Sequence, residues 1–299
     1  MVKPALALGQ EAIRVKGWLT AHKWLMLRRL SQLGFLALFL LGPWFGIWIV
    51  KGNMISSLTL ETLPLTDPYV LLQTLFAGHV VETTAVIGAL IVLAFYMLLG
   101  GRMYCSWVCP VNMVTDAAEW SRNKLGIKSG VQYSRQVRYW ILGMTLLLAL
   151  FSGTLAWELV NPVSMINRAL VFGMGFGWVM ILALFLFDTL VSKRAWCGHL
   201  CPVGAFYSLL GKFSLLRVNA YARNQCDDCM ECFAVCPEPH VIMPALKGEA
   251  KNIGSVILSS NCTNCGRCID ICGKEVFKFD HRFNNKISIK VSHQREVLP

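Results

Sequence analysis

Charged residues are scarce in this 299-residue sequence: they make up 15%, whereas hydrophobic residues make up 55%. Soluble domains carry nearer a quarter charged residues, so the composition argues against a soluble protein and for an integral membrane protein. Acidic residues are scarcer than basic ones, which leaves a formal net charge of +11. No helix-turn-helix pattern and no aromatic-and-basic RNA motif accompany the basic excess, so we expect it to set membrane topology and expect no nucleic-acid partner.

Charges are missing altogether from four apolar stretches of about the 20 residues that a helix needs to cross a bilayer. No small-residue cleavage site follows the first stretch, so we expect a retained helix and not a cleaved signal peptide. The predicted fold is therefore a polytopic α-helical membrane protein with four transmembrane helices in a domain of residues 30–216. The predicted spans are residues 30–50, 83–101, 139–157 and 169–191, the last being uncharged as far as Phe187.

Lys and Arg orient this bundle, because positively charged connections stay on the cytoplasmic side. They gather before the first span, between the second and third spans, and after the fourth. Both termini are therefore predicted to be cytoplasmic. Residues 61–79, on the outer side, predict a Pro-broken loop followed by a short helix along the outer interface. Residues 1–29 predict a basic helix on the inner membrane surface.

All twelve cysteines fall into four regularly spaced clusters on the predicted cytoplasmic side. Residues 217–299 are predicted to form a small α+β domain, because they contain the run Cys-x2-Cys-x2-Cys-x3-Cys twice, the spacing of bacterial two-cluster ferredoxins. Three thiolates so spaced wrap one corner of a cubane, and the fourth ligates the other cluster. A zinc site, the alternative, uses four ligands in two pairs. The expected [4Fe–4S] ligands are Cys226, Cys229, Cys232 and Cys272 for one cluster and Cys262, Cys265, Cys268 and Cys236 for the other.

Two further motifs, "RMYCSWVCPV" and "RAWCGHLCPV", directly follow the second and fourth spans. Their shared prefix and suffix indicate an internal duplication of the membrane domain. If each motif continues as a helix, its two cysteines lie on one face, one turn apart. Four such thiolates suffice for a third iron–sulfur centre; redox-active thiols or a transient metal site, and purely structural cysteines, are the alternatives. The residues concerned are Cys105, Cys109, Cys197 and Cys201.

A wider set of motifs resembles the NapH-type membrane component of periplasmic nitrate reductase systems, from about residue 16 to residue 280. These motifs are "LRRL", "GPWFG", "PLTDP", "CSWVCPVN", "WELVNPVS", "WCGHLCPVGA" and "CPEPHV". The resemblance implies a subunit, not catalytic alone, of a quinol dehydrogenase in the bacterial inner membrane. Its partner would be a periplasmic multi-cluster ferredoxin subunit of the NapG type, through which electrons reach periplasmic nitrate reductase. An iron–sulfur maturation or metal-reducing factor for a respiratory reductase, and a mere anchoring scaffold, are the alternatives.

Two features of this interpretation need a structural answer. The predicted clusters lie inside and the implied partner outside, across an apolar core of about 30 Å that is too thick for one electron hop.

A quinol site also needs proton acceptors, and polar groups in or beside spans are the candidates. We expect Arg102 and Arg194 to snorkel at the bilayer edge, although either is also suited to stabilise an anionic centre or a quinone oxygen. The quinol-site candidates are an outer group of His79, Glu82 and Glu158 and an inner pair of Asp188 and His199.

Overall fold

The computed structural model describes residues 8–127, 130–131, 133–173, 175 and 177–284, which divide into two compact units. The helical unit comprises Met26–Ser214 and Ser260–Cys265. The ferredoxin unit comprises Leu215–Ser259 together with the described residues before Met26 and after Cys265. Residues 1–7 of the predicted surface helix and residues 285–299 of the predicted ferredoxin domain lie outside the described residues.

The first apolar helix of the chain, α3 (Lys23–Phe45), is long and apolar enough to cross a membrane, alone among the described helices. It begins earlier than the predicted span, and it ends at Phe45 instead of continuing to residue 50. Pro43 weakens the helix near this end because it has no N–H to donate. Gly42 leaves room for the Trp48 ring, which turns back against the helix.

The other predicted spans are shorter apolar helices: α5 (Thr83–Leu99), α8 (Val137–Ser152) and α10 (Gly177–Leu186) with its continuation η3 (Phe187–Val191). The fourth predicted span, residues 169–191, is not one helix. Its beginning belongs to α9 (Pro162–Phe172), which ends at Gly173, where φ is +103°. Glycine adopts this conformation without the steric cost that a side chain would add, so the break is local to the sequence.

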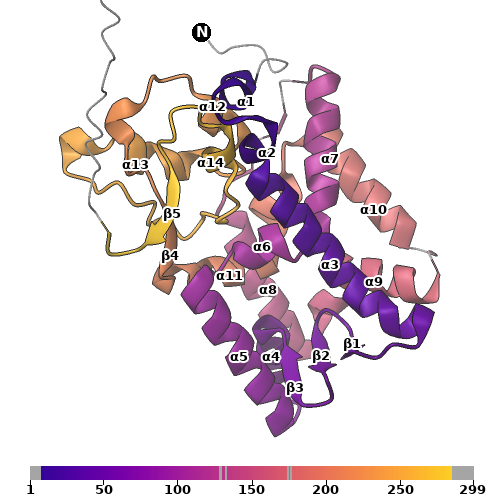
Figure 1. Ribbon diagram of the computed structural model, residues 1–299. Coiled ribbons are helices and arrows are strands. Elements are labelled where there is room, and N and C mark those ends of the chain that lie inside the picture. The colour runs from indigo at the N-terminus through magenta and orange to yellow at the C-terminus, as the bar shows by residue number, and fades with distance from the viewer. Residues whose placement is uncertain (1–7, 128–129, 132, 174, 176, 285–299) are drawn as a thin grey trace, which may run out of the picture. The chain divides into compact units, whose positions relative to one another are not determined.

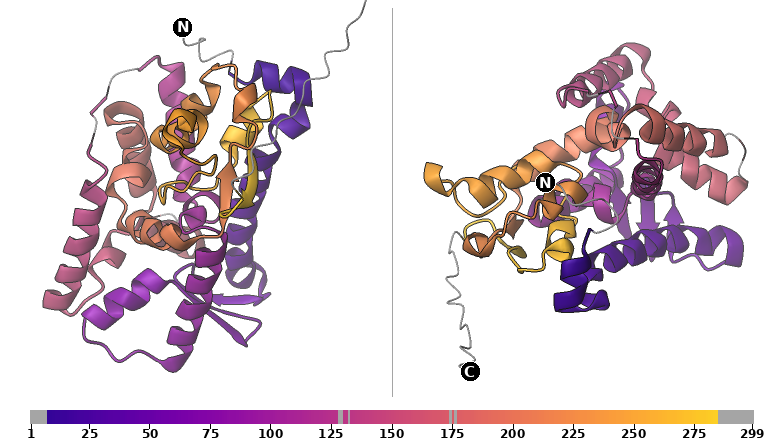
Figure 2. Two further views of the ribbon diagram at one scale, coloured as in Figure 1. Left: turned by 90° about the vertical axis from the view of Figure 1, so that its left-hand side faces the viewer. Right: turned by 90° about the horizontal axis from the view of Figure 1, so that it is seen from above.

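A small antiparallel sheet lies between α3 and α4 in the chain (Figure 1). Its strands are β1 (Val50–Gly52), β2 (Ser56–Thr59) and β3 (Leu63–Thr66), and β3 packs on α5. Figure 2 shows the sheet and α5 from two further sides.

Helix α4 (Pro68–Phe76) follows the sheet, and the Asp67 carboxylate caps it by accepting a hydrogen bond from Tyr69 N. The predicted loop followed by a short helix is therefore present, and its place along the outer interface stays a prediction. Tyr69 is fully buried and its hydroxyl lies 2.7 Å from Thr145 Oγ1 on α8, while Gln73 accepts from Trp157 N. Buried polar groups require such partners, so α4 packs within the helical unit.

The second half of the helical unit repeats this order. After α8 comes the 3-10 turn η2 (Ala156–Leu159), and then α9, whose cap is Asn161 followed by Pro162. Each half thus runs from an apolar helix through a short helix with an Asx–Pro start to a second apolar helix and a cysteine motif. The first motif forms α6 (Met103–Trp107) and leads into α7 (Val111–Lys124); the second forms η4 (Trp196–Leu200) and leads into α11 (Pro202–Leu210) and η5 (Gly211–Phe213).

The prediction that each cysteine pair shares one helical face is wrong. Cys109 follows the end of α6, and Cys201 precedes the start of α11. Pro110 and Pro202 explain both breaks, because proline cannot donate the hydrogen bond that would continue the preceding helix.

The ferredoxin unit is built on a two-stranded antiparallel ribbon, β4 (Leu216–Asn219) with β5 (Lys278–His281) (Figure 1). Within it, α12 (Glu231–Val235) packs against α14 (Arg267–Ile271). Its helices are α1 (Gln10–Lys16), α2 (Trp18–Ala21), α12 (Glu231–Val235), α13 (Ile242–Lys247) and α14 (Arg267–Ile271), with 3-10 turns at η6 (Arg223–Gln225), η7 (Pro239–Val241) and η8 (Glu249–Lys251).

The N-terminal helices belong to this ferredoxin unit, although the sequence predicted a membrane-surface helix. The Asp270 carboxylate accepts hydrogen bonds from Trp24 N and Leu25 N at 3.1 and 2.9 Å, and Lys16 Nζ donates to Ile269 O. The Trp24 ring packs edge-on against Phe279. Asp270 thus satisfies N–H groups in the first turn of α3, which have no partner inside the helix.

Candidate functional site

The two ferredoxin-type cysteine runs share one local backbone conformation. In each run the third and fifth residues are left-handed: Asp228 and Met230 in the first, Asn264 and Gly266 in the second, with φ from 47° to 73°. A short helix then begins, α12 or α14, and the fourth cysteine follows it in an extended conformation. Left-handed backbone is costly for residues other than glycine, so its repetition indicates that both loops are shaped for the same task.

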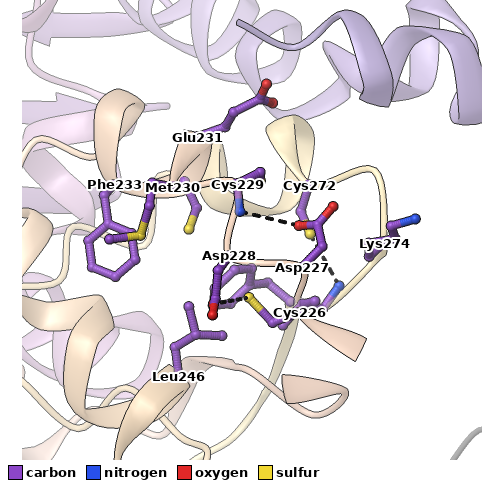
Figure 3. Close-up of a pocket in the computed structure, with 13 residues that line it drawn as sticks. Cys226, Asp227, Asp228, Cys229, Met230, Glu231, Phe233, Leu246, Cys272 and Lys274 are labelled. Carbon is purple, nitrogen blue, oxygen red and sulfur yellow. Dashed lines mark hydrogen bonds between the residues drawn. The ribbon is translucent and has the colours of Figure 1, made fainter. Parts of the chain in front are cut away.

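In the ferredoxin unit, the first predicted ligand set surrounds one cavity of about 370 Å³, open mouth included. Figure 3 shows Cys226, Cys229 and Cys272 around it, with the Glu231 carboxylate directed away. Glu231 instead accepts a hydrogen bond from Gly9 N. The fourth predicted ligand, Cys232, also lines the cavity, and apolar side chains complete the wall: Met230, Phe233, Leu246, Val276 and Phe277.

The electrostatics of this cavity suit a bound cationic cluster. Burial, reinforced by the neighbouring Cys272 and Cys226, raises the pKa of Cys232 to about 12. Burial also raises the pKa of Cys226, against the opposing effect of Lys247. Iron compensates such a cost by binding the thiolate form directly. Val276 N–H donates to Cys272 Sγ at 3.5 Å, and hydrogen bonds of this kind to ligand sulfur help to set cluster potential.

The second predicted ligand set is Cys262, Cys265, Cys268 and Cys236. Cys236 and Cys268 belong to the ferredoxin unit, and Cys262 and Cys265 belong to the segment Ser260–Cys265 of the helical unit. Its assignment to one cluster stays a prediction.

The segment Ser260–Cys265 is bound to the helical unit by the residues that stand between the first pair of motif cysteines. Ser106 Oγ donates to Thr263 O at 2.7 Å, and Trp107 Nε1 donates to Asn264 O at 3.0 Å. Arg102 donates to Asn261 O at 2.9 Å. The backbone between two ferredoxin-type cysteines is thereby fixed to the backbone of a Cys-x3-Cys-Pro motif.

The helical unit brings the four motif cysteines together around one cavity of about 560 Å³, open mouth included. The two halves contribute matching residues, including the aromatic residue before the first cysteine of each motif and the valine after each proline. They also contribute both helix caps. The matched pairs are Cys105 with Cys197, Cys109 with Cys201, Tyr104 with Trp196, Val111 with Val203, and Asp67 with Asn161.

The arginines that open the two motifs are buried, so the expectation that they snorkel is wrong. Arg102 is 3% exposed and donates to Cys197 O at 3.2 Å. Arg194 is 5% exposed and pairs with Asp116 at 2.6 Å and with Glu119, both on α7. Each arginine thus binds the opposite half of the unit, where paired charges and hydrogen bonds compensate the cost of burial.

The donor set of this cavity fits an iron–sulfur cluster. Burial raises the pKa of all four thiols, that of Cys201 to about 12, while the Arg102 guanidinium opposes the shift at Cys105. Among the described residues, no three His, Cys, Asp or Glu side chains meet closely enough to hold a single metal ion. A cubane distributes its four thiolates over four irons, so its ligands stand farther apart than those of one ion, and thiolates are the ligands that clusters use.

The predicted quinol-site residues are dispersed. His79 is exposed, with Nε2 2.9 Å from Gly153 O, and Glu82 accepts from the Thr84 hydroxyl just before α5. Neither belongs to the described lining of the four-cysteine cavity. Glu158 accepts hydrogen bonds from Asn161 Nδ2 at 3.0 Å and from Ser164 Oγ at 2.7 Å.

The inner pair has structural contacts of its own. Asp188 is buried and accepts from Trp196 N at 3.2 Å, which fixes the start of η4. The His199 ring lies 6.5 Å from the ring of Tyr133. Neither residue belongs to the described lining of the cavity.

Sequence reasoning missed Asp67, the one carboxyl group in the described lining of the four-cysteine cavity. Asp67 Oδ1 accepts from Tyr69 N at 3.0 Å and from the Tyr207 hydroxyl at 3.2 Å. Burial raises its pKa to about 6. The available signal was the Asx–Pro pair in each half, 38 residues before Cys105 and 36 before Cys197.

Comparison with known protein families agrees with both cysteine sites. The family described as "4Fe-4S binding domain" matches residues 81–128 and 174–219, so each match contains one Cys-x3-Cys-Pro motif. The family described as "4Fe-4S dicluster domain" matches residues 219–273, which contain both ferredoxin-type runs.

Individual relatives cover almost the whole chain. The ferredoxin-type protein NapH of Haemophilus influenzae is 49% identical over 93% of this chain and 96% of its own length. The chain belongs to the NapH and MauN family of ferredoxin-type proteins. The methylamine utilization ferredoxin-type protein MauN is 56% identical in Paracoccus denitrificans, over 83% of this chain and 86% of its own length. MauN of Methylorubrum extorquens is 52% identical, over 91% and 94%. No solved structure matches the chain.

Membership of this family of ferredoxin-type iron–sulfur proteins gives the chain an electron-transfer role.

Proposed function

We propose that the chain is the multi-pass inner-membrane subunit of a quinol dehydrogenase. It takes electrons from membrane quinol and passes them to a periplasmic multi-cluster ferredoxin subunit of the NapG type, and so to periplasmic nitrate reductase. Two [4Fe–4S] clusters occupy the ferredoxin-type cysteines, and a third centre occupies Cys105, Cys109, Cys197 and Cys201. The observation that carries the proposal is the convergence of these last four cysteines on one cavity.

The third centre shortens the route across the membrane. Its cavity is lined both by cysteines predicted on the cytoplasmic side and by residues of connections predicted on the outer side, namely Ile55, Asp67 and Asn161. On the cytoplasmic side, Ser106 and Trp107 bind the backbone between Cys262 and Cys265. The third centre is therefore an intermediate electron acceptor inside the helical unit, so that no single transfer has to cross the full apolar core of about 30 Å.

The outward faces of the shorter helices support placing them in a bilayer. Large apolar side chains point outward, with Trp140 77% exposed and Phe151 84% exposed on α8. The buried positions of α5 include Gly88 and Ala89. Small residues inside and large apolar residues outside are the arrangement that helices packing in lipid adopt. This pattern and the charge asymmetry support a four-span topology with both termini in the cytoplasm.

Redox spectroscopy on the purified protein tests the function. We expect quinol addition to reduce at least one iron–sulfur centre, seen as a new electron paramagnetic resonance signal under anaerobic conditions. Dithionite, a strong chemical reductant, defines the full signal of all centres. If dithionite reduces the centres and quinol reduces none of them, the chain is not a quinol dehydrogenase subunit. A maturation or metal-reducing factor would then be the better description.

A second candidate destination for the electrons is methylamine utilization. The observation that favours it is the identity to two MauN proteins, 56% and 52%, against 49% to NapH of Haemophilus influenzae. Deleting the gene in its host distinguishes the two. Loss of periplasmic nitrate reduction with normal growth on methylamine supports the first destination, and the reverse result supports the second.

A further inference from the structure

The four-cysteine cavity is nearly two-fold in its residues, and its symmetry is broken at the helix caps. Asp67 and Asn161 occupy equivalent places, each before a proline at the start of a short helix, and each accepts a hydrogen bond from the N–H two residues later. Both line the cavity. Capping needs only a side-chain oxygen, and Asn serves it as well as Asp. Capping of the helix therefore does not require a carboxyl group at residue 67.

A second feature of the cavity independently points to a ligand. Trp157 is 4% exposed and lines the cavity, yet its Nε1 has no hydrogen-bond partner among the described residues. A buried donor without an acceptor is costly, and a bound group with an oxygen would satisfy it. The cavity thus presents a carboxylate acceptor and an unsatisfied N–H donor, together with the apolar walls of Tyr104 and Trp196.

We propose that this cavity receives the head group of a hydroquinone beside the four cysteines, and that Asp67 is the catalytic residue that accepts the proton of one hydroxyl while Trp157 Nε1 donates to the other oxygen. This inference rests on the proposed function. Oxidation of one hydroquinone breaks two O–H bonds and releases two protons and two electrons. An iron–sulfur centre at the four cysteines would be the oxidant, taking the electrons one at a time and passing the first on before it accepts the second.

The surroundings of Asp67 suit a carboxylate that accepts a proton and then releases it. Oδ1 is held by Tyr69 N and by the Tyr207 hydroxyl, which fixes the orientation of the carboxylate. Asp67 passes this proton outward, and the proton of the other hydroxyl leaves through the open mouth of the cavity. Glu158, whose charge acts on Asp67, is partly exposed and lies in the connection predicted on the outer side, so it gives the proton a way to solvent.

The test uses the full chain with its clusters, menadiol as the hydroquinone, and the variant Asp67→Asn. Asparagine keeps the cap, as Asn161 does in the other half, and removes the proton acceptor. We expect menadiol to reduce the variant on the order of 100-fold more slowly than the wild type, the usual contribution of a general base. Iron content, dithionite-reduced spectra and menadione binding by equilibrium dialysis should stay at wild-type values. Glu61→Gln, the same loss of a carboxylate at an exposed residue outside the described lining of the cavity, is the matched control and should have no effect.

Each other outcome is decisive. Reduction of Asp67→Asn at the wild-type rate overturns the inference and leaves the proposed function intact. Loss of iron from Asp67→Asn also overturns it, because Asp67 would then support the centre itself. If menadiol reduces no centre even in the wild type, the proposed function fails and this inference fails with it. Trp157→Phe supplies a separate check: we expect menadione binding about fivefold weaker, as for one lost hydrogen bond, and unchanged binding contradicts the role of its N–H.

Discussion

The two cysteine-lined cavities are assembled in different ways. In the ferredoxin unit, Cys226, Cys229 and Cys232 come from one short loop whose left-handed residues turn the thiols to a common point. In the helical unit, the cysteines come from two motifs 92 residues apart, each interrupted by a proline. The first cavity is therefore specified by local backbone. The second depends on buried arginines and on the packing of two half-repeats, which makes it the more sensitive to distant substitutions.

The largest expected effect separates the two cavities by their metal. Cys105→Ser should remove the centre of the helical unit, so that the iron content falls by about one third if each of three clusters contributes equally. Cys229→Ser should remove a different third of the iron and leave the electron paramagnetic resonance signal of the helical unit's centre unchanged. Iron analysis with electron paramagnetic resonance measures both. Full iron content in Cys105→Ser would mean that the four motif cysteines hold no cluster.

The next effect concerns Arg102, which joins the two halves around the cavity of the helical unit. Arg102→Ala leaves the carbonyls of Cys197 and Asn261 without their charged donor. We expect a loss of about 3 kcal/mol in unfolding free energy, as for a buried charge-assisted contact, measured by thermal unfolding in detergent. The exposed Arg168, changed to Ala, is the control and should cost little. Equal losses in the two variants would show that Arg102 does not clamp the halves.

A pH effect is expected from Glu119, which ties Arg194 of the second motif to the helix after the first. Burial alone would raise the pKa of Glu119, but Arg194 and Lys193 hold it below the ordinary value of 4.5. Its contribution to stability is therefore complete above pH 4.5 and is lost as the pH falls through the lower, folded value. At pH 7, Glu119→Gln should cost about 2 kcal/mol.

Unfolding measured at pH 7 and at pH 3 tests this expectation. The difference between wild type and Glu119→Gln should shrink at the lower pH, because Glu119 is then increasingly protonated and, like glutamine, uncharged. A difference that is the same at both pH values would contradict the ion pair as its source.

The smallest expected effect concerns the link to the segment Ser260–Cys265. Ser106→Ala removes the hydrogen bond to Thr263 O, at a cost of about 1 kcal/mol. Amide hydrogen exchange should become faster in this segment and remain unchanged in α12 of the ferredoxin unit. Ser134→Ala removes an exposed hydroxyl that contacts only its own turn, and is the control. Unchanged exchange in Ser106→Ala would show that Trp107 and Arg102 hold the segment without it.

Family membership, the ferredoxin-type iron–sulfur character and the electron-transfer role were predicted from the sequence and are confirmed by the comparisons. These features are local, because a cysteine spacing or a short sequence motif can be recognised without knowing the fold. Helix ends were predicted less well. The breaks at Gly173 and after Phe45 depend on a single glycine and on the packing of Trp48, neither of which hydropathy detects.

The sequence by itself determined the four cysteine clusters and the duplication of the Cys-x3-Cys-Pro motif. Only the tertiary structure decided that Arg102 and Arg194 are buried clamps, that α4 turns inward, and that Asp67 reaches the four-cysteine cavity. The physical reason is distance along the chain. Spacing fixes which residues of one loop or helix turn can meet, but the meeting of residues 67, 105 and 197 depends on how whole helices pack, and no local pattern encodes that.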